Sequence, residues 1–89
     1  MVERTIIIKN KLGLHARAAV KFVNLANRFV AGVKIVKDGN EIDGKSILGI
    51  LTLAATQGSE VRLVVSGKDE TGALTALVEL INNRFDEKE

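Results

Sequence analysis

Apolar and polar residues alternate along several short stretches of the chain, as they do in strands that bury one face. In residues 2–9 the mostly apolar side carries Ile6 and Ile8. The dipeptide Asp38-Gly39 lies between two further stretches and is a strong hairpin-turn signal. Four strands are predicted, over Val2 to Lys9, Gly32 to Lys37, Asn40 to Asp43 and Glu60 to Ser66.

Apolar residues recur at helical spacing in three other stretches. One helix begins at Ala16, a short one follows Ser46 and closes by Gln57-Gly58, and a last one runs from about Glu70 to Phe85, with Asp69 as its expected cap. The faces expected to pack on the sheet are Ala19, Phe22, Val23, Ala26, Phe29 and Val30; then Ile50, Leu53 and Ala54; then Leu74, Leu77, Val78, Ile81 and Phe85.

The order of these elements is βαββαβα, and the 89 residues are enough for one domain, 1–89, with no linker. Strands with one apolar face and helices with one apolar stripe indicate a two-layer α+β fold. We therefore expect a four-stranded antiparallel sheet with its three helices on one face.

His15, the single histidine, stands at the N-cap of the first helix, and Arg17 follows in the first turn. Histidine caps poorly, and a cation opposes the helix dipole there at a cost of about 0.3–1 kcal/mol. Both residues become favourable if an anion binds among them and the free N–H groups. Because a neutral imidazole is nucleophilic near neutral pH, we expect His15 to receive a phosphoryl group and Arg17 to stabilise its charge.

Two simpler interpretations remain open for these residues. A lone histidine after Gly-Leu is usually a surface loop residue, and a lone arginine in a first turn is usually solvated. Each explains one residue, but neither explains why a poor cap and a misplaced cation occur together.

The stretch Gly13-Leu14-His15-Ala16-Arg17-Ala18-Ala19 resembles the motif Gly-Leu-His-Ala-Arg-Pro-Ala of the HPr family, the phosphocarriers of the bacterial phosphoenolpyruvate-dependent phosphotransferase system. The resemblance covers essentially the whole chain, including Lys45-Ser46-Ile47 and Gln57-Gly58. The family's proline is Ala18 here, and the chain contains no proline. Ala18 leaves the helix start less preorganised but restores an N–H donor.

The resemblance implies an open-faced β-sandwich with strand order 1-4-2-3. It implies a phosphocarrier with a transient phosphohistidine and no cofactor, rather than an independent enzyme. Phospho-enzyme I would supply the phosphoryl group to His15, and sugar-specific enzyme IIA proteins would accept it. The carrier of the nitrogen-related branch of the same system shares the histidine and is the alternative.

The helix after Ser46 is apolar nearly all round, so that part of it has no sheet to face. Either loops cover these side chains, or they form a docking surface. The resemblance favours docking, because in the HPr family this helix and the first one contact both enzyme I and the IIA proteins. The expected docking residues are Ala16, Lys21, Asn24, Ile47, Leu48 and Leu51.

Ser46 allows two interpretations. As a helix cap it contributes about 1 kcal/mol and needs no further function. The resemblance implies regulatory phosphorylation by an ATP-dependent HPr kinase. A phosphate at a helix N-terminus is physically favourable.

Charge is unevenly distributed along the chain, whose net charge is +2. Residues 1–65 hold ten Lys/Arg and five Asp/Glu, whereas residues 66–89 hold three and six. The end of the chain, Asp86-Glu87-Lys88-Glu89, is expected to be a solvated tail. Four basic side chains allow two interpretations: they gather near His15 and attract an acidic partner, or they are merely scattered over the surface. They are Arg17, Lys21, Arg28 and Lys45.

Several other classes of protein are disfavoured. The chain has no cysteine, a single histidine and no clustered carboxylates, so we expect a reducing compartment and no metal site. The charged N-terminus and short apolar runs predict a cytoplasmic protein without a signal peptide or membrane span, expected to be a monomer. An RRM-like RNA-binding sheet needs aromatic side chains on its strands to stack on the bases, but the three phenylalanines lie on the apolar faces of predicted helices. A self-sufficient hydrolase or transferase needs a base and an orienting group, and the local sequence offers only Arg17.

Overall fold

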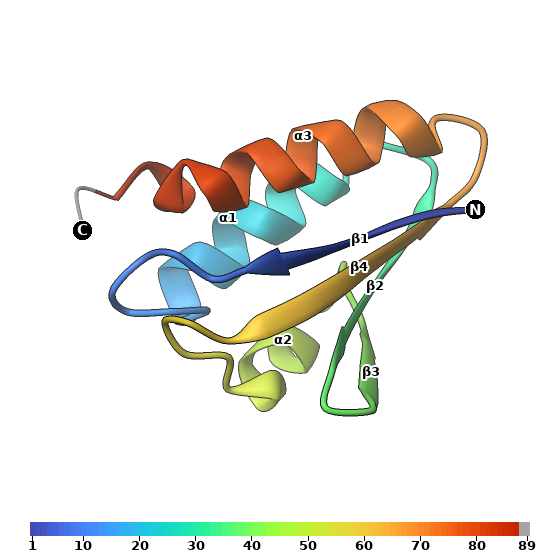
Figure 1. Cartoon of the computed structure of the whole chain (residues 1–89). Coiled ribbons are helices and arrows are strands. Elements are labelled where there is room, and N and C mark those ends of the chain that lie inside the picture. The colour runs from blue at the N-terminus through green and yellow to red at the C-terminus, as the bar shows by residue number, and fades with distance from the viewer. Residues whose placement is uncertain (88–89) are drawn as a thin grey trace.

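A computed structural model describes residues 1–87 and shows one four-stranded antiparallel sheet (Figure 1). Its strands, in the order β1-β4-β2-β3, are β1 (Val2–Ile7), β4 (Glu60–Ser66), β2 (Gly32–Lys37) and β3 (Asn40–Asp43). The helices are α1 (Ala16–Ala26), α2 (Ile47–Leu53) and α3 (Glu70–Asn82), followed by the 3₁₀ turn η1 (Arg84–Asp86). The predicted α+β open-faced sandwich, its element order and its strand order are confirmed.

The core lies between one face of the sheet and the helices. Neighbouring strands bring apolar side chains to the same face, as where Ile35 of β2 pairs with Leu63 of β4, and both are buried. Their neighbours in sequence, such as Lys34 and Arg62, are exposed on the other face. The helices complete the core with side chains that include Phe22, Ile50, Leu77 and Ile81.

The β2–β3 hairpin turns at the predicted dipeptide. Asp38 and Gly39 have φ values of 51° and 81°, and the tightest two-residue hairpin turns require positive φ at both positions. The strand predictions are correct within a few residues, although β1 ends at Ile7 rather than at Lys9.

Two predicted helical faces extend beyond the helices that carry them. α1 ends at Ala26, so Phe29 is only partly buried and Val30 is 84% exposed. α2 ends at Leu53, because Ala54 adopts a left-handed conformation (φ 51°) well before Gly58, and Ala54 is exposed. The predictions that Val30 and Ala54 pack on the sheet are therefore wrong.

The last helix also ends earlier than predicted, at Asn82. Arg84, Phe85 and Asp86 then all have positive φ, between 54° and 62°. This left-handed run turns the chain so that the Phe85 ring is buried in the core although it is not part of α3. Leu74, expected on the apolar stripe, is only partly buried.

Asp69 occupies the expected N-cap position of α3, but its carboxylate does not cap that helix. It accepts hydrogen bonds from the backbone N–H groups of Val30, at 2.9 Å, and Ala31, at 2.8 Å. These two donors hold the pKa of the Asp69 carboxyl below its usual value. Asp69 thus lies at the predicted cap position, but its carboxylate has other partners: it ties the loop between α1 and β2 to the start of α3.

The segment between β1 and α1 passes very close to the end of α2. Leu14 donates its backbone N–H to the carbonyl oxygen of Ala55 at 2.8 Å. Gly13 has φ +67°, and a Cβ there would lie 2.4 Å from that oxygen and 2.9 Å from the Cα of Thr56. Only glycine fits at this position.

We therefore expect Gly13→Ala to destabilise the protein more than Gly39→Ala does. Both positions have positive φ, which costs an alanine about 1–2 kcal/mol. An added Cβ at Gly39 meets no atom within 4 Å, whereas at Gly13 it meets backbone, which should cost roughly 1–3 kcal/mol more, the usual range for overpacking. Urea unfolding of the two variants measures the difference, and equal losses would show that the close approach is not a constraint.

Candidate functional site

His15 lies at the N-cap of α1, as predicted. Its backbone is extended (φ −80°, ψ 178°), and its side chain makes no capping hydrogen bond. The first helical bond runs from the N–H of Ala19 to the carbonyl of His15 at 2.9 Å. The N–H groups of residues 16–18 therefore precede the helical ladder and point toward the space at the helix start.

The imidazole of His15 contacts a carboxylate from the other end of the chain. Its Nε2 lies 2.7 Å from Oε1 of Glu87, and the two side chains are 27% and 18% exposed. The hydrogen bond from His15 lowers the pKa of the Glu87 carboxyl, so that Glu87 is ionised at neutral pH. The ionised Glu87 carboxylate therefore stabilises the fold. This stabilisation is fully present above the ordinary pKa of a glutamate, and it is lost as the pH falls through the lowered pKa of Glu87.

Asn10 joins this contact to the loop before α1. Its side chain is fully buried, and Nδ2 donates to the carbonyl of Gly13 at 2.7 Å and to Oε1 of Glu87 at 3.1 Å. The amide nitrogen thus bridges the loop that carries His15 and the segment that carries Glu87. Within residues 1–87, Oδ1 of Asn10 is buried without a hydrogen-bond partner.

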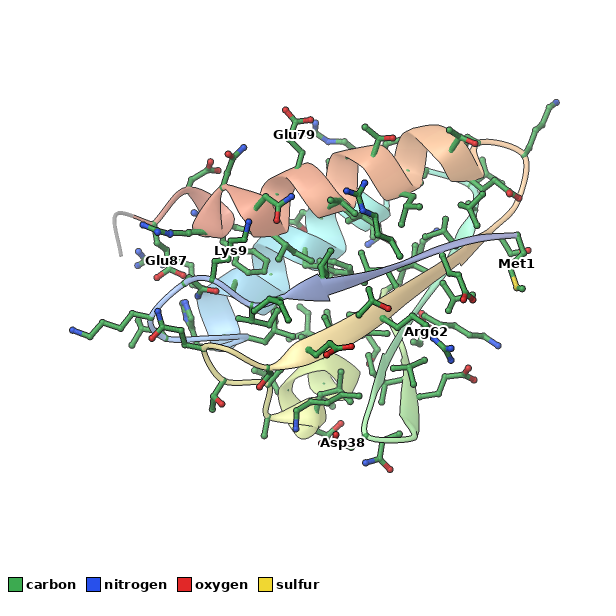
Figure 2. All side chains as sticks on the ribbon, viewed as in Figure 1. Met1, Lys9, Asp38, Arg62, Glu79 and Glu87 are labelled. Atoms are coloured by element: carbon green, nitrogen blue, oxygen red, sulfur yellow. The ribbon has the colours of Figure 1, made fainter. Side chains whose placement is uncertain are left out.

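The segment that delivers Glu87 is anchored rather than frayed. Nζ of Lys21 donates to the carbonyl of Phe85 at 2.6 Å, and the Phe85 ring is buried. Figure 2 shows Glu87 at the end of the molecule opposite Met1, beside the segment that carries Lys9. The prediction of a solvated tail is wrong for Glu87, whose side chain is held against His15. Asp86 belongs to η1, and its side chain is exposed as predicted, while Lys88 and Glu89 lie outside the described residues.

Only part of the predicted basic cluster lies near His15. Arg17 is exposed in the first turn of α1, and the half-buried Lys21 lies one turn further along. Arg28 follows the other end of the helix, where Nζ of Lys45 donates to the carbonyl of Phe29 at 2.8 Å. Since eleven helical residues span about 16 Å, Arg28 and Lys45 do not gather near His15, and for these two side chains the alternative of scattered charge holds.

Ser46 caps α2 as predicted, accepting a hydrogen bond from the N–H of Gly49 at 3.0 Å. The start of α2 lies near the end of α1, through Lys45, and its end lies near the start of α1, through Ala55. The two helices are therefore antiparallel neighbours, and Ser46 and His15 lie at opposite ends of the pair.

The predicted docking residues on α2 are exposed. Ile47 is 39% exposed, Leu48 76% and Leu51 36%, so no loop of the described chain covers them. Ala16 and Asn24 of α1 are exposed as well. Together α1 and α2 present an apolar patch next to polar side chains.

Three further observations bear on the class of the site. Within residues 1–87, no group of three or more histidine, cysteine or acidic side chains is placed to hold a metal ion. No helix in that part of the chain is long and apolar enough to span a bilayer. Phe22 and Phe85 are buried and Phe29 is partly buried, so none offers the stacking platform that an RNA-binding sheet requires.

A family model described as the PTS HPr component phosphorylation site matches residues 2–83. The chain belongs to the HPr family. Curated phosphocarrier proteins HPr from Cupriavidus necator and Pseudomonas aeruginosa are 51% and 53% identical to it, over 100% and 94% of both chains respectively. The crystal structure of HPr-C-His from Thermoanaerobacter tengcongensis covers both chains fully with a TM-score of 0.96 and 46% identity. A crystal structure titled HPr dimer, from the same organism, has a TM-score of 0.79 and 47% identity over 98% of this chain.

In this HPr-family chain the sequence does not point to Glu87 or Asn10 as neighbours of His15. Glu87 stands in a charged run of a kind that is normally solvated, and Asn10 looks like one more loop residue. The only local signal is Phe85, an aromatic residue two positions before Glu87, whose burial fixes where Glu87 lies.

Proposed function

We propose that this HPr-family chain, folded as one domain over residues 1–89, carries a phosphoryl group on His15. Phospho-enzyme I, itself phosphorylated from phosphoenolpyruvate, supplies the group, and a sugar-specific enzyme IIA protein takes it. The observation that carries the proposal is a partly exposed imidazole at the start of α1 that makes no capping hydrogen bond. The N–H groups of residues 16–18 lie outside the helical ladder there, and Arg17 stands in the first turn. Such a site suits a dianionic group.

We further propose that the chain is a carrier in the cytoplasm and not an independent enzyme. Among residues 1–87, the ring of His15 is hydrogen-bonded to Glu87 and to no hydroxyl group, and the chain has no cysteine. A ring that is held in place but has no catalytic partner within its own chain can accept a phosphoryl group and transfer it. The other catalytic side chains are then supplied by the partner proteins.

The exposed apolar side chains of α2, together with Ala16, Lys21 and Asn24 of α1, are proposed as the docking surface for both partners. This surface adjoins the start of α1, because Leu14 is bonded to Ala55 just after α2. An exposed cluster of this kind favours protein contact. We propose that the chain docks there as a monomer.

Ser46 is proposed as a regulatory phosphorylation site for an HPr kinase. Its hydroxyl caps α2 and is half-buried, at the edge of the apolar patch. A phosphate there would be tolerated by the helix dipole, but it would have to lose its hydration when a partner covers the patch. Phosphorylation of Ser46 should therefore weaken docking.

His15→Ala should abolish phosphorylation, because the variant lacks the nucleophile. The experiment incubates each protein with phosphoenolpyruvate, Mg²⁺ and enzyme I and records phosphorus NMR, with enzyme I of the nitrogen-related branch in a parallel sample. Wild type should gain one acid-labile phosphoryl group and lose it to an IIA protein. The fold should be retained, with a loss of about 1 kcal/mol because the hydrogen bond to Glu87 is removed. Acid-labile phosphate on the alanine variant would contradict the proposal.

Arg17→Lys should slow transfer without preventing docking. The substitution keeps the charge but loses the planar fork that can bind two phosphoryl oxygens, so we expect a fall of about 10-fold in rate, the effect of one lost charge-assisted hydrogen bond. Single-turnover kinetics with phospho-enzyme I measure the rate. Arg28→Lys, at the far end of α1, is the matched control. Equal rates for wild type and the Arg17 variant would show that Arg17 is merely solvated.

Leu48→Asp should weaken binding to enzyme I while changing stability by no more than about 0.5 kcal/mol, because the side chain is 76% exposed. Titration calorimetry and thermal unfolding test both parts. Ile50→Asp, a buried position two residues along, is the control that should unfold the protein. Undiminished binding by Leu48→Asp would remove Leu48 from the docking surface.

A further inference from the structure

The Glu87 carboxylate is held against the imidazole from several directions. The buried Phe85 ring and its carbonyl bond to Lys21 fix the backbone two residues earlier. The buried amide of Asn10 then donates to the same oxygen, Oε1, that contacts Nε2 of His15. A flexible tail would not hold one carboxylate oxygen between two donors in this way.

This contact determines which ring nitrogen can react. A carboxylate is only an acceptor, so the nitrogen that faces it, Nε2, must carry a proton. In a neutral imidazole the other nitrogen then has a free lone pair. The contact therefore leaves Nδ1 as the nucleophile.

We propose that Glu87 is a positioning residue for His15: its carboxylate keeps the proton on Nε2 and stabilises the positive charge that the ring gains when Nδ1 is phosphorylated. This inference rests on the proposed phosphocarrier function of His15. The residue touches the ring rather than the phosphoryl group, so it acts through His15. Arg17, exposed in the first turn of α1, is left to bind the phosphoryl oxygens.

The transfer step needs no proton movement on the ring. The Nδ1 lone pair forms the N–P bond while the bond between phosphorus and the donor's leaving group breaks, and that bonding pair stays with the donor. The ring becomes a phosphoimidazolium whose Nε2 proton still faces Glu87. When an acceptor attacks phosphorus, the N–P electron pair returns to Nδ1, and the leaving group is the same neutral tautomer that entered the cycle.

Three variants distinguish the effect of the Glu87 charge from that of its hydrogen bond and from that of its position in the chain. Glu87→Gln keeps an acceptor of the same size without the charge, and Glu87→Ala removes both. Asp86→Asn is the matched control, because it removes a neighbouring exposed carboxylate at a left-handed position that asparagine tolerates. Amide spectra of all three verify that the fold is retained.

The first readout is the ring of the unphosphorylated protein at pH 7. In a long-range ¹⁵N–¹H spectrum, wild type and Asp86→Asn should show a protonated Nε2 and an unprotonated Nδ1. In Glu87→Ala the two nitrogen signals should move toward each other as the tautomers mix. Unchanged signals in Glu87→Ala would overturn the proposal.

The second readout is the rate at which phospho-enzyme I phosphorylates the ring. We expect a fall of about 10-fold in Glu87→Ala, a smaller fall in Glu87→Gln and none in Asp86→Asn, since the charge-assisted hydrogen bond that stabilises the forming phosphoimidazolium is lost. Equal rates in wild type and Glu87→Ala would also overturn the proposal. A wild type that accepts no phosphate would instead disprove the phosphocarrier role of His15, and the ring spectra would still decide whether Glu87 positions it.

Discussion

The approach of residues 13 and 14 to Ala55 is the constraint on which the site depends. It requires a residue without a Cβ at Gly13, and it is fixed by the bond from Leu14 N–H to the Ala55 carbonyl. Because Leu14 is buried, the next residue must emerge at the surface. His15 therefore stands where the loop after β1, the start of α1 and the end of α2 meet. Backbone packing thus sets where His15 emerges, and the contact with Glu87 then holds its ring.

Features that depend on a few adjacent residues could be predicted from the sequence. The hairpin needs only two positions that tolerate positive φ, and Asp38-Gly39 supplies them. The start of α1 follows from where the helical period begins, which is why His15 was placed correctly at its N-cap. The alternation of apolar and polar residues likewise predicts the strands, and the exposed face of α2 follows because a two-layer fold leaves nothing to cover it.

Features that depend on distant parts of the chain could not be predicted. Three left-handed residues in a row, none of them glycine, cost roughly 3–6 kcal/mol, so local propensity argues against the turn at Arg84–Asp86. Burial of the Phe85 ring returns about 1.5–3 kcal/mol. The bonds made by Lys21 and Glu87 add about 1 kcal/mol each. The carboxylate of Asp69 was misassigned for the same reason, since its partners lie about 40 positions earlier.

The antiparallel course of α1 and α2 sets the two helix starts, at His15 and Ser46, at opposite ends of one surface. The seven residues of α2 alone span about 10 Å, which already exceeds the Debye length of about 8 Å at physiological salt. A charge at Ser46 is thus electrically remote from the imidazole. A partner that covers about 800 Å², however, has a footprint wide enough to include both ends. If partners dock on this surface as proposed, a charge at Ser46 would lower their affinity while leaving the chemistry of the ring unchanged.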